Sequence, residues 1–240
     1  MPDLRVYAEQ NPRTPGGLRR WKAILNPFGV PERTDPPPFR RRGKEARERL
    51  LAMVLLVPAG AMMAAVAAAI GVEAIIDPTS RGPVFFVEAR MSRGRTISLV
   101  KFRILNRAAL DSLGDGPTHI KGFEGTEVTR VGRVLRDWYL DELPQIINIV
   151  RGDMFFIGTR PWPLEYAKAE VVTGELRKFE MPGGLIGPVQ SYKGVLSPTE
   201  KELDKEYWEA FTTWSWRELL VLDWQIVRRS MMVQMAHEGH

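Results

Sequence analysis

A run of 23 consecutive residues without a charged side chain, residues 50–72, constrains this chain more than any other feature of its sequence. As an α-helix rising about 1.5 Å per residue, the run would reach roughly 34 Å, enough to cross a hydrocarbon core of about 30 Å. The run starts 49 residues into the chain and is not preceded by a short N-terminal n-region, so we do not expect it to be a signal peptide. A buried helix of a soluble core is the alternative, but an unbroken uncharged run of this length favours a membrane helix.

Two further features predict the path of this helix. The basic cluster in residues 40–49, just before the run, predicts a cytoplasmic position for that flank. Inside the run, Pro58 removes a backbone hydrogen bond and clashes with the preceding turn, so a bend is expected there. No second apolar run of this length follows. A straight span would place residues 77–240 outside the cytoplasm, whereas a re-entrant helical hairpin bent at Pro58 keeps them inside.

The basic excess lies in the first fifth of the chain. The whole sequence holds 34 Lys and Arg against 29 Asp and Glu, a net charge of +5. Residues 1–49 hold 12 basic and 6 acidic side chains, a net +6, which leaves −1 for the remaining 191 residues. We predict a basic, Pro-rich, mostly irregular arm over residues 1–43. Its charge indicates an anionic partner, which could be membrane lipid, nucleic acid or a phosphorylated substrate.

The residues that are scarce exclude several kinds of chemistry. The chain has no cysteine, which excludes disulfides, thiol nucleophiles and Cys-zinc sites. It has three histidines, two of them in the last four residues, so a Ser-His-Asp triad or a histidine metal site would depend on His119 alone. The common glycine-rich nucleotide-binding loops are absent too. Catalysis therefore has to use carboxylates, lysine and arginine.

The pattern predicts a helix-rich α/β fold. A β-hairpin is expected from strands at 84–87 and 96–103 around a turn at 92–95, and another short strand at 154–157. Helices are expected at 131–139, from Asp141 to about Gly152, and at 163–180, 199–210 and 215–235. The last of these carries Trp216 and Trp224 on an amphipathic pattern, which suits a membrane interface as well as it suits an ordinary packed helix.

The strongest candidate for chemistry is the adjacent pair Asp141 and Glu142. One carboxylate can attack as a nucleophile while the other holds a divalent cation. A phosphoryl centre is anionic, so such a site also needs basic side chains, and the candidates are Arg136, Arg160, Lys101 and Arg103. From spacing alone, an acidic pair at a helix start is more often a cap that complements the helix dipole.

Four sequence blocks favour a catalytic pair over a helix cap, because their order and spacing resemble those of a known family. They are Gly82-Pro83-Val84-Phe85-Phe86 with Lys101-Phe102-Arg103, residues 129–136 (TRVGRVLR), Leu140-Asp141-Glu142-Leu143-Pro144-Gln145 with Asn148 and Gly152-Asp153-Met154, and Gly158-Thr159-Arg160-Pro161. The tail from Trp214 to Ile226 is also similar. Over residues 44–228 the chain resembles the bacterial sugar transferases, the monotopic phosphoglycosyl transferases.

The resemblance implies an activity: transfer of a sugar 1-phosphate from a UDP-sugar to a polyprenol (undecaprenyl) phosphate, with release of UMP. Asp141 would be the nucleophile on the β-phosphate, forming a covalent phosphoglycosyl-aspartyl intermediate, and Glu142 would hold Mg²⁺ together with Asp141. The remaining substrate-binding residues implied are Arg136, Arg160, Lys101, Arg103, Gln145 and Arg90. A re-entrant membrane helix bent at a proline is also typical of the family, and here Pro58 matches it.

The chain departs from the family pattern at several positions. Glu88 stands where glutamine is usual, Ser92 where glycine is usual in the hairpin turn, and Tyr139 where serine is usual. Val57 and Thr159 replace a usual serine and a usual proline, and residues 105–128 diverge. None of these changes removes the acidic pair. They bear on the sugar specificity and on the membrane helix rather than on the reaction.

We predict the basic arm over 1–43, the re-entrant membrane helix over 44–77, a cytoplasmic catalytic domain over 78–235 and a tail over 236–240. The expected location is the bacterial inner membrane, with the catalytic domain on the cytoplasmic face. Expected partners are a UDP-sugar, polyprenol phosphate, anionic lipids and a second copy in a homodimer, but no nucleic acid. A catalytically inert membrane scaffold is the alternative. A membrane-tethered nucleic-acid binder is less favoured, because the basic arm lacks interleaved aromatic residues.

Overall fold

The computed structural model describes residues 24–25, 31–32, 41–113, 125–164, 166–167, 181–192 and 200–235. The chain forms two compact units, each assembled from separate stretches of sequence. The first unit takes Met1–Lys44, Arg90–Ile97 and Asp153–Gly239, and the second takes Glu45–Ala89 and Ser98–Gly152. The predicted helix-rich α/β composition is confirmed. The predicted membrane and cytoplasmic boundaries stay predictions.

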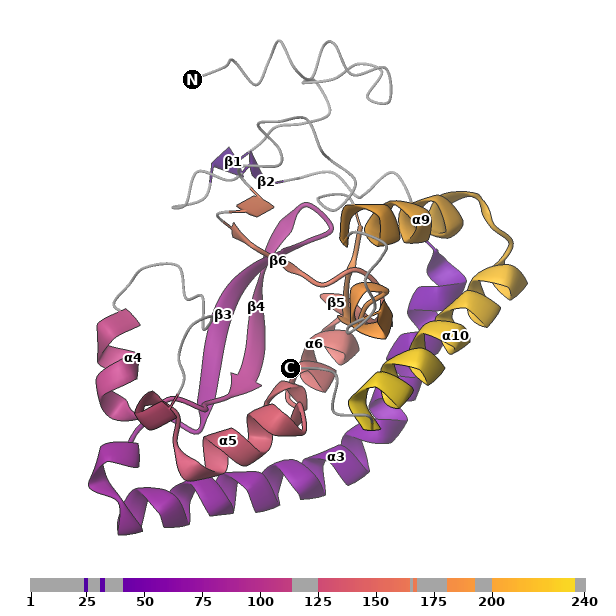
Figure 1. Ribbon diagram of the computed structural model, residues 1–240. Helices are drawn as coiled ribbons and strands as arrows, with labels where there is room; N and C mark the ends of the chain where they lie inside the picture. Colours follow the sequence, from indigo (N-terminus) through magenta and orange to yellow (C-terminus); the bar gives the residue numbers. More distant parts are fainter. Residues whose placement is uncertain are drawn as a thin grey trace. The chain divides into compact units, whose positions relative to one another are not determined.

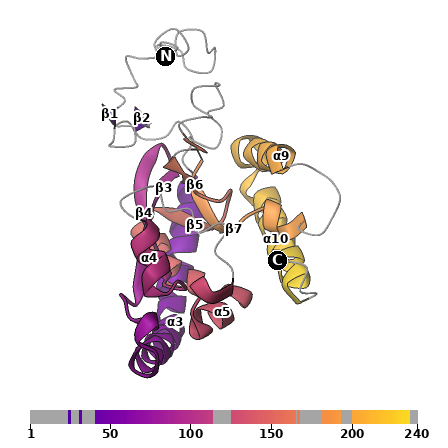
Figure 2. The ribbon, with the colours of Figure 1, turned by 60° about the vertical axis from the view of Figure 1, so that its left-hand side comes forward.

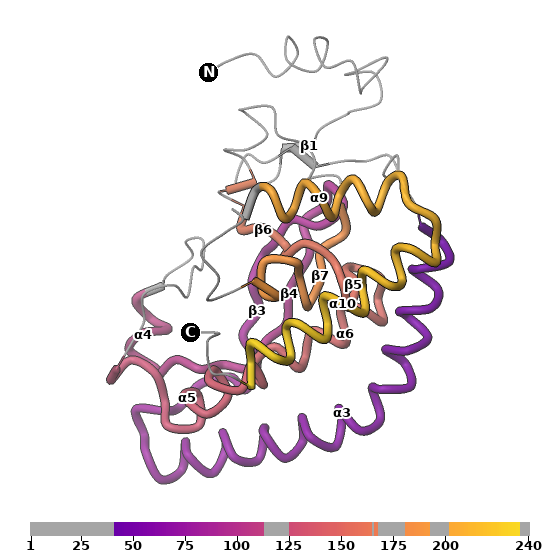
Figure 3. Tube along the Cα trace, turned by 45° about the vertical axis from the view of Figure 1, so that its right-hand side comes forward, coloured from indigo at the N-terminus to yellow at the C-terminus, as the bar shows by residue number. Residues whose placement is uncertain are grey.

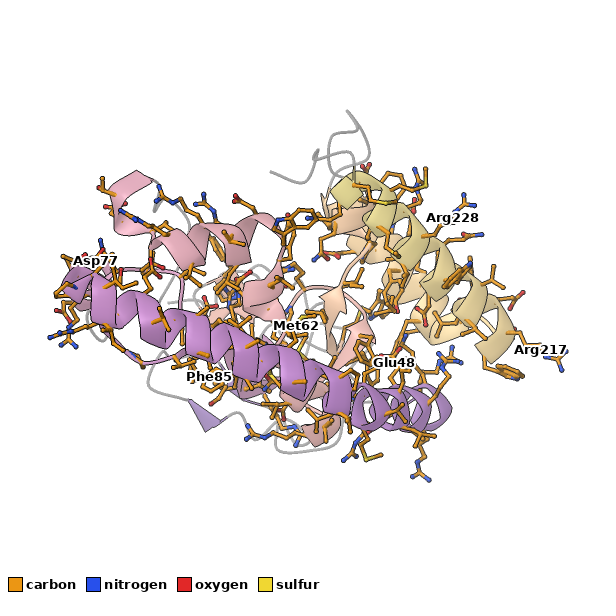
Figure 4. All side chains as sticks on the ribbon, turned by 90° about the horizontal axis from the view of Figure 1, so that it is seen from below. Glu48, Met62, Asp77, Phe85, Arg217 and Arg228 are labelled. Atoms are coloured by element: carbon orange, nitrogen blue, oxygen red, sulfur yellow. The ribbon has the colours of Figure 1, made fainter. Side chains whose placement is uncertain are left out.

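The apolar run lies in one continuous helix, α3 (Arg42–Ile76), with Pro58 inside it. Figure 1 and Figure 3 show that the helix is curved, and Figure 4 shows Glu48 and Met62 along it and Asp77 just beyond its end. Within the described residues it is the single helix long and apolar enough to cross a membrane, judged by length and composition. Only 11% of its most apolar window is buried, which does not fit a soluble core helix. The predicted re-entrant path stays a prediction.

The second unit continues from α3 through a short 3₁₀ turn, η1 (Pro78–Ser80), and carries α4 (Arg107–Leu113), η2 (Gly125–Glu127), α5 (Arg130–Asp137), η3 (Leu140–Glu142) and α6 (Gln145–Arg151). Its apolar core includes Ile70 of α3, Phe102, Leu105 and Leu135. Arg49 of α3 donates from Nε to the Val150 carbonyl at the end of α6, 3.1 Å away, which places a cation at a helix C-terminus.

A long β-hairpin formed by β3 (Phe85–Ser92) and β4 (Arg95–Phe102) is shared by both units. The predicted hairpin is confirmed, although β3 runs further than expected. At its tip, Arg93 and Gly94 both have positive φ, 55° and 69°. Two consecutive left-handed residues give the backbone twist that matches the strands of a two-residue hairpin. Glycine adopts this conformation freely, whereas Arg93 adopts it at a steric cost.

The first unit is built on two parallel strands, β5 (Met154–Ile157) and β7 (Gly183–Ile186), which lie side by side in Figure 2. β6 (Trp162–Pro163) pairs with the hairpin tip, because Arg90 and Met91 lie opposite Pro163 and Trp162. The short turn η4 (Val189–Tyr192) and the helices α9 (Glu200–Thr213) and α10 (Trp216–Met235) complete the unit. Its core packs residues of β5 against both helices: Phe155, Ile157, Tyr207, Phe211, Leu219 and Ile226.

Local sequence explains where α10 begins. Ser215 precedes it, and Glu218 lies three residues further on, so the two form a reciprocal capping box. The Ser215 backbone N–H donates to Glu218 Oε2 at 2.9 Å. Several large apolar side chains of this helix are exposed, among them Trp216, Val221, Trp224 and Met232. The interfacial position predicted for α10 stays a prediction.

Several predicted elements are confirmed with shifted ends. The strand at 154–157 and the helices at 131–139, 199–210 and 215–235 correspond to β5, α5, α9 and α10. Of the predicted helix at 163–180, Pro163 lies in β6 and residues 164, 166 and 167 are helical, while residues 168–180 lie outside the described residues, as does most of the arm at 1–43. Within the arm, β1 (Ile24–Leu25) and β2 (Pro31–Glu32) form an antiparallel pair.

Candidate active site

The acidic pair does not lie in the first turn of an α-helix, as the sequence predicted. Asp141 and Glu142 belong to η3, and α6 begins after Pro144. Tyr139, which precedes η3, has a left-handed backbone with φ of 54°. A non-glycine residue in this region is uncommon and marks a sharp change of chain direction. The turn between α5 and η3 therefore fixes the position of the pair, which precedes the first residue of α6.

The two carboxylates of the pair differ in exposure. Asp141 is half-buried, whereas Glu142 is 7% exposed. A buried carboxylate depends on neighbouring cations and donors, because it has lost most of its hydration. The half-buried Asp141 is the more accessible of the two to an incoming group. The roles that the resemblance implies, Asp141 as the nucleophile and Glu142 as a ligand of Mg²⁺, stay predictions.

Lys101 of β4 lies between two buried glutamates. Its Nζ is 3.6 Å from Oε1 of Glu142 and 3.8 Å from Oε2 of Glu88 on β3. The Lys101 side chain is 12% exposed and the Glu88 side chain 3% exposed. The structure therefore brings two of the predicted residues together, Lys101 and Glu142. It also adds Glu88, to which the sequence analysis gave no role.

Asn148 of α6 fixes the acidic pair against the strand that carries Lys101. Its side chain is fully buried and accepts from the Val100 backbone N–H at 3.1 Å, while its Nδ2 donates to the Ser98 carbonyl at 2.8 Å. The single side-chain amide thus forms two hydrogen bonds with the backbone on either side of Leu99, as a neighbouring strand would. The sequence block that carries the resemblance includes Asn148, but nothing in that pattern indicated this bridging contact.

Arg136 occupies the last turn of α5, and its Nε lies 3.7 Å from the carboxylate of Asp137. Both side chains are well exposed, at 38% and 56%, so this ion pair adds little stability. A cation in the last turn also complements the helix dipole. The structure leaves the guanidinium accessible to solvent on the helix that leads directly into η3, and its predicted contact with phosphate stays a prediction.

The start of α5 is held by the long apolar helix α3. The carboxylate of Glu73, near the end of α3, accepts from the backbone N–H groups of Arg130 at 2.6 Å and Val131 at 3.3 Å. Thr129 caps the same helix by accepting from the Gly132 N–H at 2.9 Å. At Gly132 a Cβ would lie 2.3 Å from the Ile104 carbonyl oxygen, so only glycine fits. α5, and with it the approach to the acidic pair, is thus fixed from two sides.

Arg103 has partners that the sequence did not predict. Its guanidinium is buried and donates to three backbone carbonyls: Nη2 to Ser80 at 2.8 Å, Nε to Pro83 at 2.8 Å and Nη1 to Leu105 at 2.6 Å. Burial lowers the pKa of Arg103, while the nearby charge of Glu73 acts in the opposite direction. These bonds tie the segment after α3 to the end of β4. The predicted contact of Arg103 with substrate stays a prediction.

Gln145, the first residue of α6, is 2% exposed. Its side-chain nitrogen is buried and has no hydrogen-bond partner among the described residues. A buried amide without a partner is unusual in a native structure and carries a desolvation cost. Its predicted contact with substrate is not tested by this observation.

Two predicted residues, Arg160 and Arg90, belong to the first unit. Arg160 ends the loop after β5, where Gly184 approaches Gly158 so closely that a Cβ on Gly184 would lie 2.2 Å from the Gly158 nitrogen. The Gly184 N–H donates to the Thr159 carbonyl at 2.6 Å. This packing explains the glycines of both segments and holds the loop of Arg160 rigid. Arg90 is half-buried on β3, opposite Pro163 of β6.

The residues near Lys101 fit Mg²⁺ as a partial set of ligands. In the described ranges there is no cluster of three or more His, Asp or Glu side chains placed to hold a metal by themselves. Mg²⁺ in phosphoryl-transfer sites commonly takes one or two protein carboxylates and completes its shell with water and substrate phosphates. The predicted binding of Mg²⁺ by Asp141 and Glu142 stays a prediction.

The structure thus gathers an acidic pair and a lysine in a unit that also carries a long apolar helix. The chain belongs to the bacterial sugar transferase family, whose model matches residues 39–236. The resemblance seen in the sequence is thereby confirmed.

Individual relatives carry more specific names. A Caulobacter vibrioides protein named UDP-glucose:undecaprenyl-phosphate glucose-1-phosphate transferase is 34% identical over 197 residues, covering 77% of this chain and 70% of that protein. An Escherichia coli protein of the same name is 28% identical and is covered over 37% of its length. An Aeromonas hydrophila protein named as an N-acetylgalactosamine phosphotransferase is 28% identical over 42% of its length. The relatives thus share undecaprenyl phosphate as acceptor and differ in the sugar.

Proposed function

We propose that this chain transfers a sugar 1-phosphate from a UDP-sugar to undecaprenyl phosphate and releases UMP. The family match over residues 39–236 and the names of its relatives support this reaction class. The observation that carries the proposal is the second unit's acidic pair, with the ammonium of Lys101 3.6 Å from the carboxylate of Glu142. The unit thus combines a half-buried carboxylate, a buried one and a cation.

In the first half-reaction, a carboxylate oxygen of Asp141 attacks the β-phosphorus of the UDP-sugar. A new P–O bond forms to Asp141 while the bond from the β-phosphorus to the bridging oxygen breaks. That oxygen leaves with the electron pair on UMP. The sugar phosphate is now an acyl phosphate on Asp141. Charge is conserved, because the negative charge of the carboxylate passes to the leaving phosphate, and no proton transfer is needed for this step.

In the second half-reaction, a phosphate oxygen of undecaprenyl phosphate attacks the same phosphorus. The bond to Asp141 breaks and returns the electron pair to the carboxylate, while a diphosphate bond forms to the lipid. A covalent intermediate divides one difficult displacement between two anions into two steps with separate nucleophiles. The chain lacks cysteine and uses no histidine in this scheme, in agreement with the exclusions drawn from its composition.

Repulsion between the carboxylate and the phosphates is the main obstacle, and cations have to offset it. Lys101 lies beside Glu142, and Arg136 lies on the helix that precedes η3. Glu142 with Asp141 would hold Mg²⁺, which when bound supplies positive charge to the diphosphate and its leaving oxygen. Glu142 is nearly buried, so water screens its charge only weakly and its attraction for a cation is stronger than it would be at the surface.

We further propose that the apolar helix α3 attaches the protein to the bacterial inner membrane with the active site on the cytoplasmic face. The acceptor is a membrane lipid, so the enzyme has to reach the bilayer, and the UDP-sugar is a cytoplasmic donor. α3 exposes large apolar side chains along its N-terminal half, including Leu50, Val54 and Val57, and the basic residues before it suit anionic headgroups. A homodimer stays a prediction.

The test is UMP release by the full chain in nanodiscs, with Mg²⁺, undecaprenyl phosphate and a panel that includes UDP-glucose and UDP-N-acetylgalactosamine. Asp141→Asn should lower UMP release by about 10³-fold or more, because an amide is a far weaker nucleophile. Asp137→Asn is the matched control, since Asp137 lies one turn earlier with an exposed side chain, and it should leave the rate nearly unchanged.

The covalent route has its own measurement. Without the lipid, mass spectrometry should find a sugar-phosphate adduct on the peptide that contains Asp141. UMP formation without an adduct, and only when the lipid is present, would support direct transfer instead. No UMP from any sugar nucleotide of the panel would favour the inert scaffold.

A further inference from the structure

The helix α3 contacts both ends of the segment that carries the acidic pair. This segment runs through α5, η3 and α6, and it belongs to the second unit together with most of α3. Near the end of α3, Glu73 contacts the first residues of α5. Near the start of α3, Arg49 contacts the end of α6. Asp141 and Glu142 follow the first contact and precede the second along the chain.

At the start of α5, Glu73 supplies acceptors that the helix itself does not have. The first N–H groups of an α-helix have no partner within the helix. Oε1 of Glu73 accepts from the Arg130 N–H at 2.6 Å, and both carboxylate oxygens lie 3.3 Å from the Val131 nitrogen. Glu73 is buried, and Figure 1 shows α5 lying alongside α3. An anion at this end of α5 also suits the helix dipole.

At the end of α6, Arg49 makes the complementary contact. Its Nε donates at 3.1 Å to the carbonyl of Val150, one of the last carbonyls of α6, which have no acceptor role within the helix. A cation suits this end of a helix as an anion suits the other. Arg49 is exposed, so we expect its contact to be the weaker of the two. Each end of the segment is thus held by a side chain of α3 with the charge that the helix end favours.

The turn between the two helices depends on them for its position. η3 spans three residues, in which the Glu142 N–H donates to the Tyr139 carbonyl at 3.3 Å and the Leu143 N–H to the Leu140 carbonyl at 3.1 Å. The hydrogen-bond geometry of a 3₁₀ turn is poorer than that of an α-helix, so a short turn adds little rigidity of its own. A displacement of α5 or α6 would therefore move Asp141. For a reacting group, a displacement of about 1 Å can lower the rate roughly a hundredfold.

We propose that Glu73 and Arg49 are positioning residues, through which α3 fixes the place of the acidic pair. Each acts through the helix whose end it holds, Glu73 through α5 and Arg49 through α6. The expected effect on the rate rests on the proposed function. The hold of α3 on α5 concerns the structure alone, so it can be tested without any reaction.

The first test measures UMP release by the full chain in nanodiscs, at a temperature at which each variant is folded. Glu73→Ala should lower kcat roughly ten- to a hundredfold and Arg49→Met about three- to tenfold, with little change in the KM for the UDP-sugar. Glu73→Gln keeps an acceptor oxygen and Arg49→Lys keeps a charged donor, so each should restore most of the rate. If Glu73→Ala does not fold, Glu73→Asp withdraws the carboxylate by one methylene and should show part of the same loss.

Asp77→Ala and Arg81→Met are the matched controls, because they remove an acidic and a basic side chain of the same unit. Asp77 accepts hydrogen bonds from Thr79 in η1, and Arg81 donates from Nε to the Ala74 carbonyl at 3.3 Å. These hydrogen bonds do not reach α5 or α6. Both variants should therefore lower the unfolding temperature slightly and leave kcat unchanged.

The second test needs no activity. The chain has no native cysteine, so spin labels can be attached to cysteines introduced at Val54 of α3 and Val134 of α5, both of which are exposed. Pulsed electron paramagnetic resonance measures the distribution of distances between the two labels. This distribution should widen in Glu73→Ala and keep its width in Asp77→Ala.

The outcomes separate the hypotheses. An unchanged kcat in Glu73→Ala, in a protein whose unfolding temperature falls, would make the contact purely structural and overturn the inference. Equal losses of kcat in the two controls, or a loss in Glu73→Ala without a wider distance distribution, would overturn it as well. If the distribution widens but even the wild type releases no UMP from any sugar nucleotide, the hold of α3 on α5 stands while the proposed function fails.

Discussion

The two units both bury a lysine next to acidic side chains, but they do so in different ways. In the first unit, Lys44 contacts Asp223 at 2.5 Å, and the hydroxyl of Tyr207 donates to the other oxygen of Asp223 at 2.8 Å. In the second unit, Lys101 lies 3.6 and 3.8 Å from its two glutamates. The first group is bonded directly, whereas the second is held at a distance.

This difference distinguishes an ion pair that stabilises the fold from one that lies at the candidate active site. Tight pairing with a supporting hydroxyl compensates for the desolvation of Lys44 and Asp223, and it joins the start of α3 to α10. At Lys101 both N···O distances exceed those of a direct charge-assisted hydrogen bond, and such an ion pair beside the acidic pair is a candidate for a role in function rather than in stability. Variants that remove one charge should therefore affect stability in the first unit and activity or metal binding in the second.

The largest effect on stability should come from Asp223→Asn. It leaves the buried Lys44 ammonium without its counter-charge, which should cost about 3–5 kcal/mol of unfolding free energy. Chemical denaturation in detergent, with proteolysis of the C-terminal helices as a second probe, would measure this. The double variant Lys44→Met with Asp223→Leu removes both charges and should recover most of the loss. A single variant as stable as the wild type would remove the contrast drawn between the units.

An intermediate effect is expected from Arg103→Met in the second unit. The change leaves three buried carbonyls without their donor, at a cost of about 2–4 kcal/mol, since each unsatisfied group costs about 1–3 kcal/mol and some would recover water. Arg107→Met is the control, because Arg107 forms an exposed pair with Asp111 that should contribute less than about 0.5 kcal/mol. Thermal unfolding would compare them. Activity lost without any loss of stability would instead assign Arg103 to substrate.

The smallest effects concern one exposed carboxyl in each unit. Hydrogen bonds from Thr79 hold the pKa of Asp77 below its usual value, and those from Ser215 do the same for Glu218. A lowered folded-state pKa contributes stability above the unfolded value, near pH 4, which is lost as the pH falls through the folded value. Asp77→Asn and Glu218→Gln should each reduce the amount by which the unfolding temperature falls between pH 5 and about pH 3. The change in each variant should be smaller than the loss of stability expected for Arg103→Met. If the unfolding temperature of both variants fell as steeply with acidification as that of the wild type, this prediction would be contradicted.

Local patterns in the sequence were sufficient for the elements that depend on near neighbours. The apolar run, the hairpin and the helix end at Gly152 follow from hydrophobicity, turn residues and a left-handed glycine, and the structure has all three. The placement of Asp141 was wrong because Pro144 was read as part of a first helical turn, whereas Tyr139 bends the chain and Asp141 falls in a separate 3₁₀ turn. A positive φ at tyrosine has no signal in a single sequence.

Contacts over long sequence distances were the harder part. The three carbonyl partners of Arg103 gave no signal in the sequence, because a basic side chain near Lys101 is equally suited to carbonyls or to phosphate, and its predicted contact with substrate stays a prediction. Glu88 was noticed only as an unusual residue, because its meaning depends on Lys101 across the hairpin and on Glu142 further along the chain. Glu73 gave no signal either, since its partners are backbone groups 57 residues away.

The shared hairpin has a consequence for how this protein could arise or be engineered. β3 and β4 each give residues to both units, so neither unit is a continuous stretch of the chain. No single cut in the gene yields a fragment that encodes one unit complete. Recombination between related enzymes would therefore have to exchange the catalytic pair and the C-terminal helices together with the strands between them, and a chimera with its junction inside the hairpin should join mismatched halves of both units.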